Sequence, residues 1–296
     1  MFEQIIGNEK IKKDLKSIAN QNKNSHSYLF IGIEGIGKRQ IAQEFSKMLL
    51  CLGEEKYCNK CKSCIEFDTN NNPDFMQINP DGNSIKIEQI REMQRKVIEA
   101  PIISKKKIYI IDDADTMTKE AQNCLLKTLE EPPEYACIIL IASNENNILT
   151  TIKSRCTIIK FEKISDEDIK KYLKEKYEIN DINDNLLQAF QGSVGKAETL
   201  KDKQDLYDSI FNIIDKIEKL NLIEVLNLAE IIYQSQDDKF EILEYMNVIL
   251  FNKGKENIKY LNCINIVEDT KKRLKANSNY NMCIDNMLFS IWEEMN

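Results

Sequence analysis

The sequence predicts an α/β domain with a parallel sheet, followed by a small helical domain and a C-terminal helical bundle. Short apolar runs alternate with segments of helical spacing as far as Phe161, which is typical of a parallel sheet covered by helices. The strand pattern then stops, and Leu, Ile and Tyr recur at three- and four-residue spacing. The expected domains are residues 1–162, 163–204 and 205–296.

Five apolar runs are the expected strands. In the strongest, Lys107–Asp112, four consecutive apolar side chains precede a carboxylate. Continuous apolar runs of this length are typical of strands buried on both faces of a parallel sheet. The other runs are Tyr28–Ile31, Phe75–Ile78, Cys137–Ala142 and Thr157–Phe161.

Helical spacing fills the segments between and after these strands. Pro101 and Pro132 end two of the expected helices, because the residue before a proline is disfavoured in helical conformation. The expected helices are 8–21, 38–50, 87–100, 118–131, 166–177, 183–191 and 196–203, with about four longer ones from residue 205 onward.

Composition excludes several classes of protein. The chain has 296 residues, 42% hydrophobic and 30% charged, which is the balance of a globular protein. No apolar stretch approaches the roughly 18 residues of a membrane span, and the N-terminal residues lack the pattern of a signal peptide. We therefore expect a cytoplasmic protein without a membrane partner. A net charge of -7 disfavours a surface built throughout to hold DNA.

The segment Gly32–Arg39 matches the phosphate-loop motif G-x-x-x-x-G-K-[ST] at all but its last position, and it joins an expected strand to an expected helix. Its glycines are Gly32, Gly35 and Gly37. Such glycines let backbone N–H groups surround phosphate oxygens, and Lys38 would neutralise their charge. The motif ends in a hydroxyl that binds magnesium, which Arg39 lacks. The segment therefore predicts a nucleotide site with impaired hydrolysis, and whether ATP or ADP binds there stays open.

Two carboxylates after the Lys107–Ile111 run agree with a degenerate nucleotide site. Asp112 stands where a carboxylate holds magnesium through water. Hydrolysing sites usually follow it with Glu, which orients the attacking water, and Asp113 is one methylene shorter. An acidic turn at the end of a strand is the alternative interpretation. The combination with Lys38 favours the nucleotide site.

Four of the nine cysteines are crowded into one polar segment with the spacing C-x6-C-x2-C-x2-C. They are Cys51, Cys58, Cys61 and Cys64. Cytosolic cysteines rarely form disulfides, and four thiolates so spaced are typical of a tetrahedral structural zinc site. An iron–sulfur cluster is the alternative, but nothing else in the sequence indicates electron transfer.

Taken together, these segments resemble the AAA+ clamp-loader family of bacterial DNA polymerase III. The resemblance covers about residues 1–200, and the last third shows only generic helices. It rests on the phosphate loop and the four cysteines, and on His26–Phe30, Asn72–Asp74, Ile85–Arg91, Ile110–Met117, Asn123–Pro133 and Ser154–Cys156.

The resemblance implies a RecA-like sheet domain, a helical lid and a helical collar that joins five subunits into a ring. Such a ring opens a sliding clamp and places it on primed DNA, so the implied partners are gamma/tau- and delta-type subunits, with the clamp and DNA reached through the assembly. It also implies that Arg155 is an arginine finger acting on a neighbour's nucleotide. Gly195 stands where a hydrolysing subunit carries a phosphate-sensing arginine.

Three departures, at Arg39, Asp113 and Gly195, favour a non-hydrolysing ring subunit. One alternative is an ATP-hydrolysing motor subunit of the same loader, which Arg39 disfavours. Another is a zinc-stabilised nucleic-acid-binding module with a vestigial nucleotide fold, which the negative net charge disfavours. For Arg155 the alternative is a surface salt bridge without function.

Overall fold

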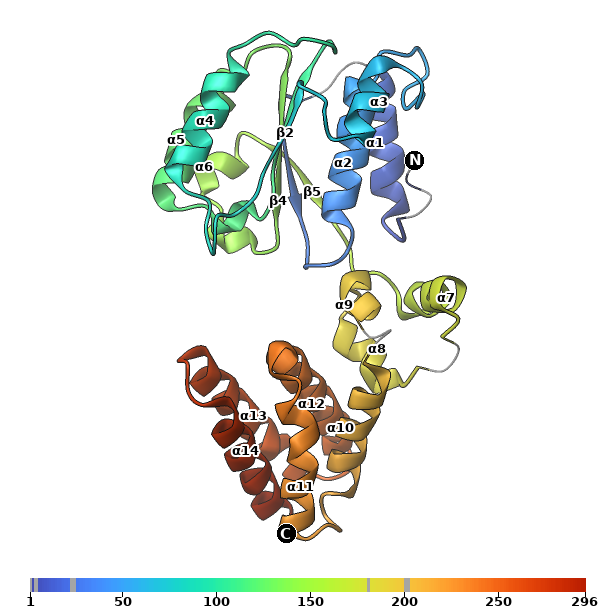
Figure 1. Cartoon of the computed structure of the whole chain (residues 1–296), viewed down its shortest axis with the longest axis vertical. Helices are drawn as coiled ribbons and strands as arrows, with labels where there is room; N and C mark the ends of the chain where they lie inside the picture. The colour runs from blue at the N-terminus through green and yellow to red at the C-terminus, as the bar shows by residue number, and fades with distance from the viewer. Residues whose placement is uncertain (1, 3–4, 22–24, 180–181, 200–202) are drawn as a thin grey trace. The chain divides into compact units, whose positions relative to one another are not determined.

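The computed structural model describes residues 2, 5–21, 25–179, 182–199 and 203–296 (Figure 1). The chain divides into two compact units. The first contains residues 1–168 together with Ser193–Gly195, and the second contains residues 169–192 and 196–296. The expected lid and collar thus fall mostly within one unit, and the three-domain division stays a prediction.

A five-stranded sheet forms the centre of the first unit. Its strands are β1 Ser27–Ile31, β2 Phe75–Ile78, β3 Lys107–Ile111, β4 Ala136–Ala142 and β5 Thr157–Lys160. They lie in the order β2-β3-β4-β1-β5, and every neighbouring pair is parallel. The predicted α/β fold class is confirmed, with β1 between β4 and β5.

Helices cover both faces of this sheet (Figure 1). One face carries α1 Glu9–Gln21 and α2 Lys38–Leu50, with α3 Lys62–Asp68 beside α2; the other carries α4 Ile87–Val97, α5 Lys119–Glu130 and α6 Thr150–Lys153. Side chains alternate along β1: Tyr28 and Phe30 pack in the cluster that contains Phe45 of α2, whereas Leu29 packs in the cluster that contains Leu125 of α5. Both faces of the sheet are therefore buried at β1, β3 and β4, whereas the edge strand β5 is mostly exposed.

Helix α4 is shorter than the sequence predicts. It ends at Val97, whereas the helical pattern continues to Ala100. The hydroxyl of Tyr135 donates to the carbonyls of Val97 and Ile98, and buried Lys107 donates from Nζ to the carbonyl of Lys96. These partners satisfy the last carbonyls of the helix. Contacts from distant segments, rather than local propensity, therefore set its end.

The described residues of the second unit form helices and their connections, without a strand. After α7 Asp166–Tyr177, α8 Asp184–Phe190 and α9 Val194–Thr199 come α10 Gln204–Lys216, α11 Leu222–Tyr233, α12 Lys239–Gly254, α13 Lys259–Lys275 and α14 Tyr280–Met295. The described part of the chain thus has five longer helices where about four were expected, and the end of the predicted 196–203 helix lies outside the described residues. None of the described helices has the length and apolar character that a membrane crossing requires.

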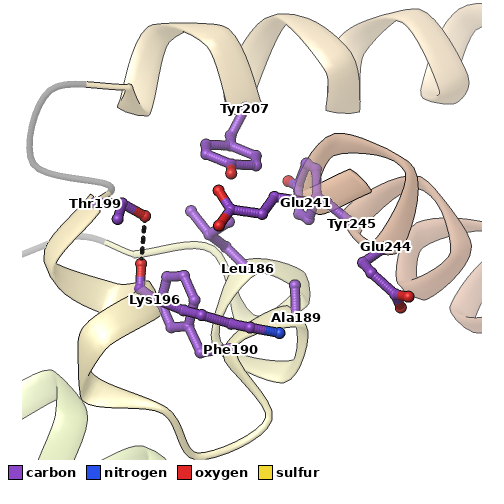
Figure 2. A pocket seen from close by; sticks show the side chains of 9 residues that line it. All are labelled: Leu186, Ala189, Phe190, Lys196, Thr199, Tyr207, Glu241, Glu244 and Tyr245. Carbon is purple, nitrogen blue, oxygen red and sulfur yellow. Dashed lines mark hydrogen bonds between the residues drawn. The ribbon is translucent and has the colours of Figure 1, made fainter. Parts of the chain in front are cut away.

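A small cavity lies among α8, α9, α10 and α12 (Figure 2). Its volume is about 20 Å³, which is room for one molecule the size of water. The hydroxyl of Tyr245 and one carboxylate oxygen of Glu241 are buried there without a hydrogen-bond partner among the described residues. A nucleotide does not fit in this space, so the candidate functional site lies elsewhere.

Candidate functional site

The segment between β1 and α2 has the conformation of a phosphate loop. It begins at the carboxyl end of β1, where the N–H of Gly32 donates to the carbonyl of Ala142 over 3.3 Å. Gly35 and Gly37 have φ of +75° and +88°, in the left-handed region that glycine adopts without a steric penalty. The two glycines let the loop turn back and point the N-terminus of α2 at its centre.

Lys38 is buried, and its amine is bound by the loop itself. Nζ donates to the carbonyl oxygens of Gly32 and Ile33, over 2.7 and 2.8 Å, and to Oγ of Ser143 over 3.1 Å. Burial lowers the pKa of Lys38 below its ordinary value, although the charge of Asp115 opposes this shift. The group that would reach a phosphate thus serves here to close the loop.

Arg39 forms an ion pair with Asp112. Its Nε lies 3.2 Å from Oδ2 of Asp112, whose side chain is 9% exposed against 55% for that of Arg39. Burial raises the pKa of the Asp112 carboxyl, and the charge of Arg39 opposes this rise. The carboxylate that would hold magnesium is therefore paired with a cation from the same chain.

The structure adds two residues that the sequence analysis did not place in the site. Ser143 follows β4 and accepts the third hydrogen bond from Lys38. The carboxylate of Asp115 accepts from the backbone N–H groups of Ser143 and Asn144, over 3.2 and 2.9 Å. Asp113, by contrast, is exposed, with φ of +48°. The sequence contains one signal that could have identified Ser143, which is its position directly after an apolar run. The carboxyl ends of parallel strands lie along one edge of a sheet, so a residue that follows such a run lies near the phosphate loop.

Gly195 packs directly on the phosphate loop. Its N–H donates to the carbonyl of Gly35 over 2.8 Å. A Cβ at Gly195 would lie 2.9 Å from the Cα of Gly35, closer than real Cβ contacts come. The position where a hydrolysing relative is expected to carry arginine therefore has no room for any side chain in this arrangement.

Gly195→Ala is expected to lower the free energy of unfolding by about 1–3 kcal/mol, the usual cost of forcing an added methyl into a packed site. The methyl must push the backbone of Gly35, which cannot move aside as a flexible side chain can. Denaturant unfolding of the full chain measures the change. Unaltered stability would show that this contact is loose in solution.

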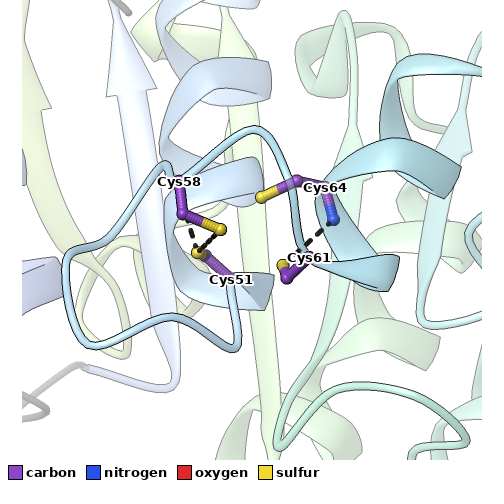
Figure 3. A group of neighbouring side chains, drawn as sticks. All are labelled: Cys51, Cys58, Cys61 and Cys64. Atoms are coloured by element: carbon purple, nitrogen blue, oxygen red, sulfur yellow. Dashed lines mark hydrogen bonds between the residues drawn. The ribbon is translucent and has the colours of Figure 1, made fainter.

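The four cysteines meet at one point (Figure 3). Their sulfur atoms all lie within 4.8 Å of one another, and those of Cys51 and Cys58 are 3.6 Å apart. Zinc–sulfur bonds of about 2.3 Å in a tetrahedron require sulfur–sulfur distances of roughly 3.8 Å. The residues present therefore fit a four-coordinate metal site that leaves no position for water or substrate.

Two helix ends position these thiols. Cys51 caps the C-terminus of α2, and Cys61 caps the N-terminus of α3, where its Sγ accepts from the N–H of Cys64. Backbone N–H groups of Lys60 and Cys61 lower the pKa of the Cys58 thiol to about 6, whereas burial raises the pKa of Cys64. Cys58 thus supplies a thiolate at neutral pH, the form that binds metal.

A buried polar network fastens this cluster to the α/β unit. The hydroxyls of Ser63 and Ser104 are 2.8 Å apart, and the side-chain amide of Asn72 donates to the carbonyl of Ser63 over 2.9 Å. Buried Asp74 accepts the backbone N–H groups of residues 102–104 over 2.6–2.8 Å. The cluster therefore sits on a rigid support.

Arg155 lies between α6 and β5. Its guanidinium is 2.7 Å from Oε1 of Glu130 and donates to the carbonyl of Thr151 over 2.9 Å, and 35% of its side chain is exposed. Tyr28 of β1 is in register with Thr157 of the parallel strand β5. Arg155 therefore lies at the amino end of these strands, opposite the edge that carries the phosphate loop.

The structure thus separates the predicted residues into three places. The phosphate loop and the strand-end carboxylates share one edge of the sheet: Gly32, Gly35, Gly37, Lys38, Arg39, Asp112 and Asp113. The four cysteines form a second site beside α2 and α3. Arg155 is apart from both in the fold and does not contribute to its own chain's phosphate loop.

Two of the curated relatives that this chain matches are subunits of DNA polymerase III. DNA polymerase III subunit gamma/tau of Mycoplasma genitalium is 35% identical over 76% of this chain and 38% of the relative. DNA polymerase III subunit delta-prime of Bacillus subtilis is 33% identical over 72% of this chain and 64% of the relative. The chain thus spans less than two thirds of the length of either relative.

Among solved structures, a gamma subunit-related protein of DNA polymerase III from Thermotoga maritima has a TM-score of 0.62 over 95% of this chain and 99% of its own, at 21% identity. That likeness concerns the fold. The family model described as "DNA polymerase III, delta subunit" matches residues 7–165, which is more than half of the chain. The protein therefore belongs to the DNA polymerase III delta subunit family.

Proposed function

We propose that this protein is the delta-prime-type subunit of the bacterial DNA polymerase III clamp loader, a cytoplasmic ring subunit that does not hydrolyse ATP itself. The family membership supports a role in this polymerase, but relatives named gamma/tau and delta-prime are about equally similar. The observation that favours the non-hydrolysing type is the ion pair between Arg39 and Asp112.

The ion pair bears on hydrolysis because phosphoryl transfer depends on positioning and on charge stabilisation by magnesium. Arg39 supplies no hydroxyl ligand, and it engages the carboxylate that would hold the ion. Asp113 is too short to place a water as Glu does, and Gly195 offers no phosphate-sensing charge. Each departure removes a different contribution to phosphoryl transfer. Together they leave a site that does not hydrolyse ATP.

Arg155 carries the catalytic part of the proposal. Its exposed guanidinium would stabilise charge on the γ-phosphate of a nucleotide held by a gamma/tau-type neighbour, since a planar fork can bridge phosphate oxygens. Engagement would exchange the Glu130 ion pair for a phosphate. In this proposal residues 163–204 serve as the lid and 205–296 as the collar that joins the other ring subunits. The sliding clamp and primed DNA are reached through the assembled polymerase complex.

For the four-cysteine cluster we propose structural zinc. The sulfur spacing suits zinc, and all four ligands come from the protein, so the metal would stabilise residues 51–68 and take no part in chemistry. Cys51, Cys58, Cys61 and Cys64 would hold it as thiolates. Zinc affinity should therefore fall as pH falls, because protons compete for the sulfurs.

A gamma/tau-type motor is the second candidate, and its support is the 35% identity to such a subunit. The two candidates differ in intrinsic turnover. We expect the purified chain to show no ATP hydrolysis above background, and Arg39→Thr combined with Asp113→Glu to raise it. A colorimetric phosphate assay with magnesium measures both. ATP turnover by the unaltered chain of about 1 s⁻¹, the low end of the range for ordinary enzymes, would favour the motor subunit.

The ring role has its own test. Co-expression with gamma/tau and delta subunits from one bacterium should yield a complex that contains this chain and loads the clamp on primed DNA. Loading that is equally fast without this chain would overturn the proposed role, whatever the chain's own turnover.

A further inference from the structure

We propose that the small cavity of the second unit is a binding site for one water molecule, which joins the hydroxyl of Tyr245 to the carboxylate of Glu241. Helices α8, α9, α10 and α12 surround this cavity (Figure 2). The inference concerns the second unit alone, and it holds whatever role the chain has in a polymerase complex.

Two residues that line the cavity have buried polar atoms without a hydrogen-bond partner in the described part of the chain. They are Tyr245, which is completely buried, and Glu241, of which one carboxylate oxygen is concerned. The two residues are four positions apart on α12, so their side chains lie on one face of that helix. Nearly all buried polar atoms in proteins have a partner, which is either a protein group or an ordered water. One water can donate to the Glu241 carboxylate while it accepts from the Tyr245 hydroxyl.

The size of the cavity suits this ligand. Its volume of about 20 Å³ exceeds the roughly 10–15 Å³ that one water needs, and it leaves no room for an organic molecule. Apolar cavities stay empty, but a cavity that offers a water two or more polar partners is filled. The carboxylate of Glu241 and the hydroxyl of Tyr245 are two such partners.

Packed aromatic rings hold the Tyr245 hydroxyl in place. The rings of Tyr207 and Tyr245 meet edge to face, with centroids 5.0 Å apart and planes at 88°. Buried Leu186 and Phe190 of α8 line the other side of the cavity. Because the oxygen of a phenol is fixed in line with its ring, Tyr245 cannot reach a different partner unless the ring itself moves. Its hydroxyl must therefore be satisfied inside the cavity.

The charges nearby keep this hydroxyl a donor. Burial raises the pKa of Tyr245, and the charge of Asp208 raises it further. Burial and the charges of Glu241 and Asp238 likewise raise the pKa of Tyr207. Both phenols stay protonated at neutral pH, so Tyr245 can donate to the water. The water thereby satisfies the polar part of the face of α12 that packs against α8.

The first test is the stability of the full chain with Tyr245→Phe, which removes the hydroxyl and keeps the ring. Trp292 on α14 is the single tryptophan, so its fluorescence reports the unfolding of the second unit in denaturant. Loss of a water-bonded hydroxyl should raise the unfolding equilibrium constant about fivefold, the usual net value of one hydrogen bond. Removal of an unpartnered buried hydroxyl has the opposite sign, because such a group destabilises the folded state. Greater stability of Tyr245→Phe would therefore overturn the proposal.

Tyr280→Phe is the matched control. The Tyr280 hydroxyl is also buried, but it donates directly to the carbonyl of Ile232 over 2.9 Å. The same substitution there removes a hydrogen bond of the protein with itself and leaves the cavity untouched. We expect a similar loss of stability in Tyr280→Phe, without any loss of bound water.

The second test counts the water directly. Oxygen-17 magnetic relaxation dispersion measures the number of water molecules that stay bound for longer than the protein takes to rotate. Tyr245→Phe combined with Glu241→Leu removes both partners, so this number should fall by one, whereas Tyr280→Phe should leave it unchanged. A crystal structure of the unaltered chain should show one ordered water bonded to both Tyr245 and Glu241. An unchanged number in the double variant would overturn the proposal, and so would a direct bond between the Tyr245 hydroxyl and another protein group.

Discussion

Cys61→Ser is expected to strip the four-cysteine cluster of its metal and to destabilise residues 51–68. Three thiolates would remain, and Cys61 also caps α3 through its sulfur. Structural zinc in small peptides contributes an apparent free energy of roughly 10–16 kcal/mol, so losing most of this affinity is a large effect. Elemental analysis of chain purified without chelator should find about one zinc in the unaltered protein and little in the variant.

Chelation separates metal loss from a damaged fold. EDTA should lower the free energy of unfolding of the unaltered chain and leave that of Cys61→Ser unchanged, because the variant has no metal to lose. Cys124→Ser is the matched control: Cys124 is half-buried, lies outside the cluster, and its thiol donates to Gln94, a bond that a hydroxyl can replace. Iron in place of zinc would favour the alternative interpretation, an iron–sulfur cluster.

Arg155→Ala is expected to cut the DNA-stimulated ATP turnover of the reconstituted ring while leaving the fold intact. Arginine fingers contribute about 10³–10⁵ to the rate at the site that they serve. The loss for the whole ring should be partial, because other sites keep their own fingers. The free energy of unfolding should change by no more than about 1 kcal/mol, since the Arg155 side chain is exposed and its ion pair with Glu130 is at the surface.

Glu130→Ala is the matched control for this experiment. It removes the same 2.7 Å ion pair but keeps the arginine, so turnover should stay near that of the unaltered ring. Arg155→Lys should restore only part of the activity, because an ammonium is a point charge without the planar fork. Equal losses in Arg155→Ala and Glu130→Ala would assign the residue to a structural ion pair. Unchanged turnover in both would also end the proposed role.

The strands and the longer helices of the first unit were predictable because each has a local signal. The run Lys107–Asp112 is apolar on both faces, and the observed strand is buried along its whole length. Thr118 was expected near the start of a helix, and its hydroxyl accepts the N–H of Ala121 there. The end of α4 was not predictable, since Tyr135 and Lys107 come from later in the chain.

Local sequence patterns also could not predict part of the candidate site. Helix α3 follows directly on Cys61, and a polar seven-residue helix has too little periodicity to be recognised. The contribution of Ser143 depends on β4 lying beside β1, and the strand order comes from crossovers that no single segment encodes. The closure of Gly195 on Gly35 likewise joins residues far apart in the chain.

By itself, the sequence determined the fold class, the phosphate loop and the cysteine spacing, because periodicity, glycine positions and short intervals between ligands act over a few residues. It also identified Arg39 as a departure from the motif. Only the tertiary structure decided what that departure does. Arg39 and Asp112 are distant in sequence, and they pair because β1 and β3 end at the same edge of one parallel sheet.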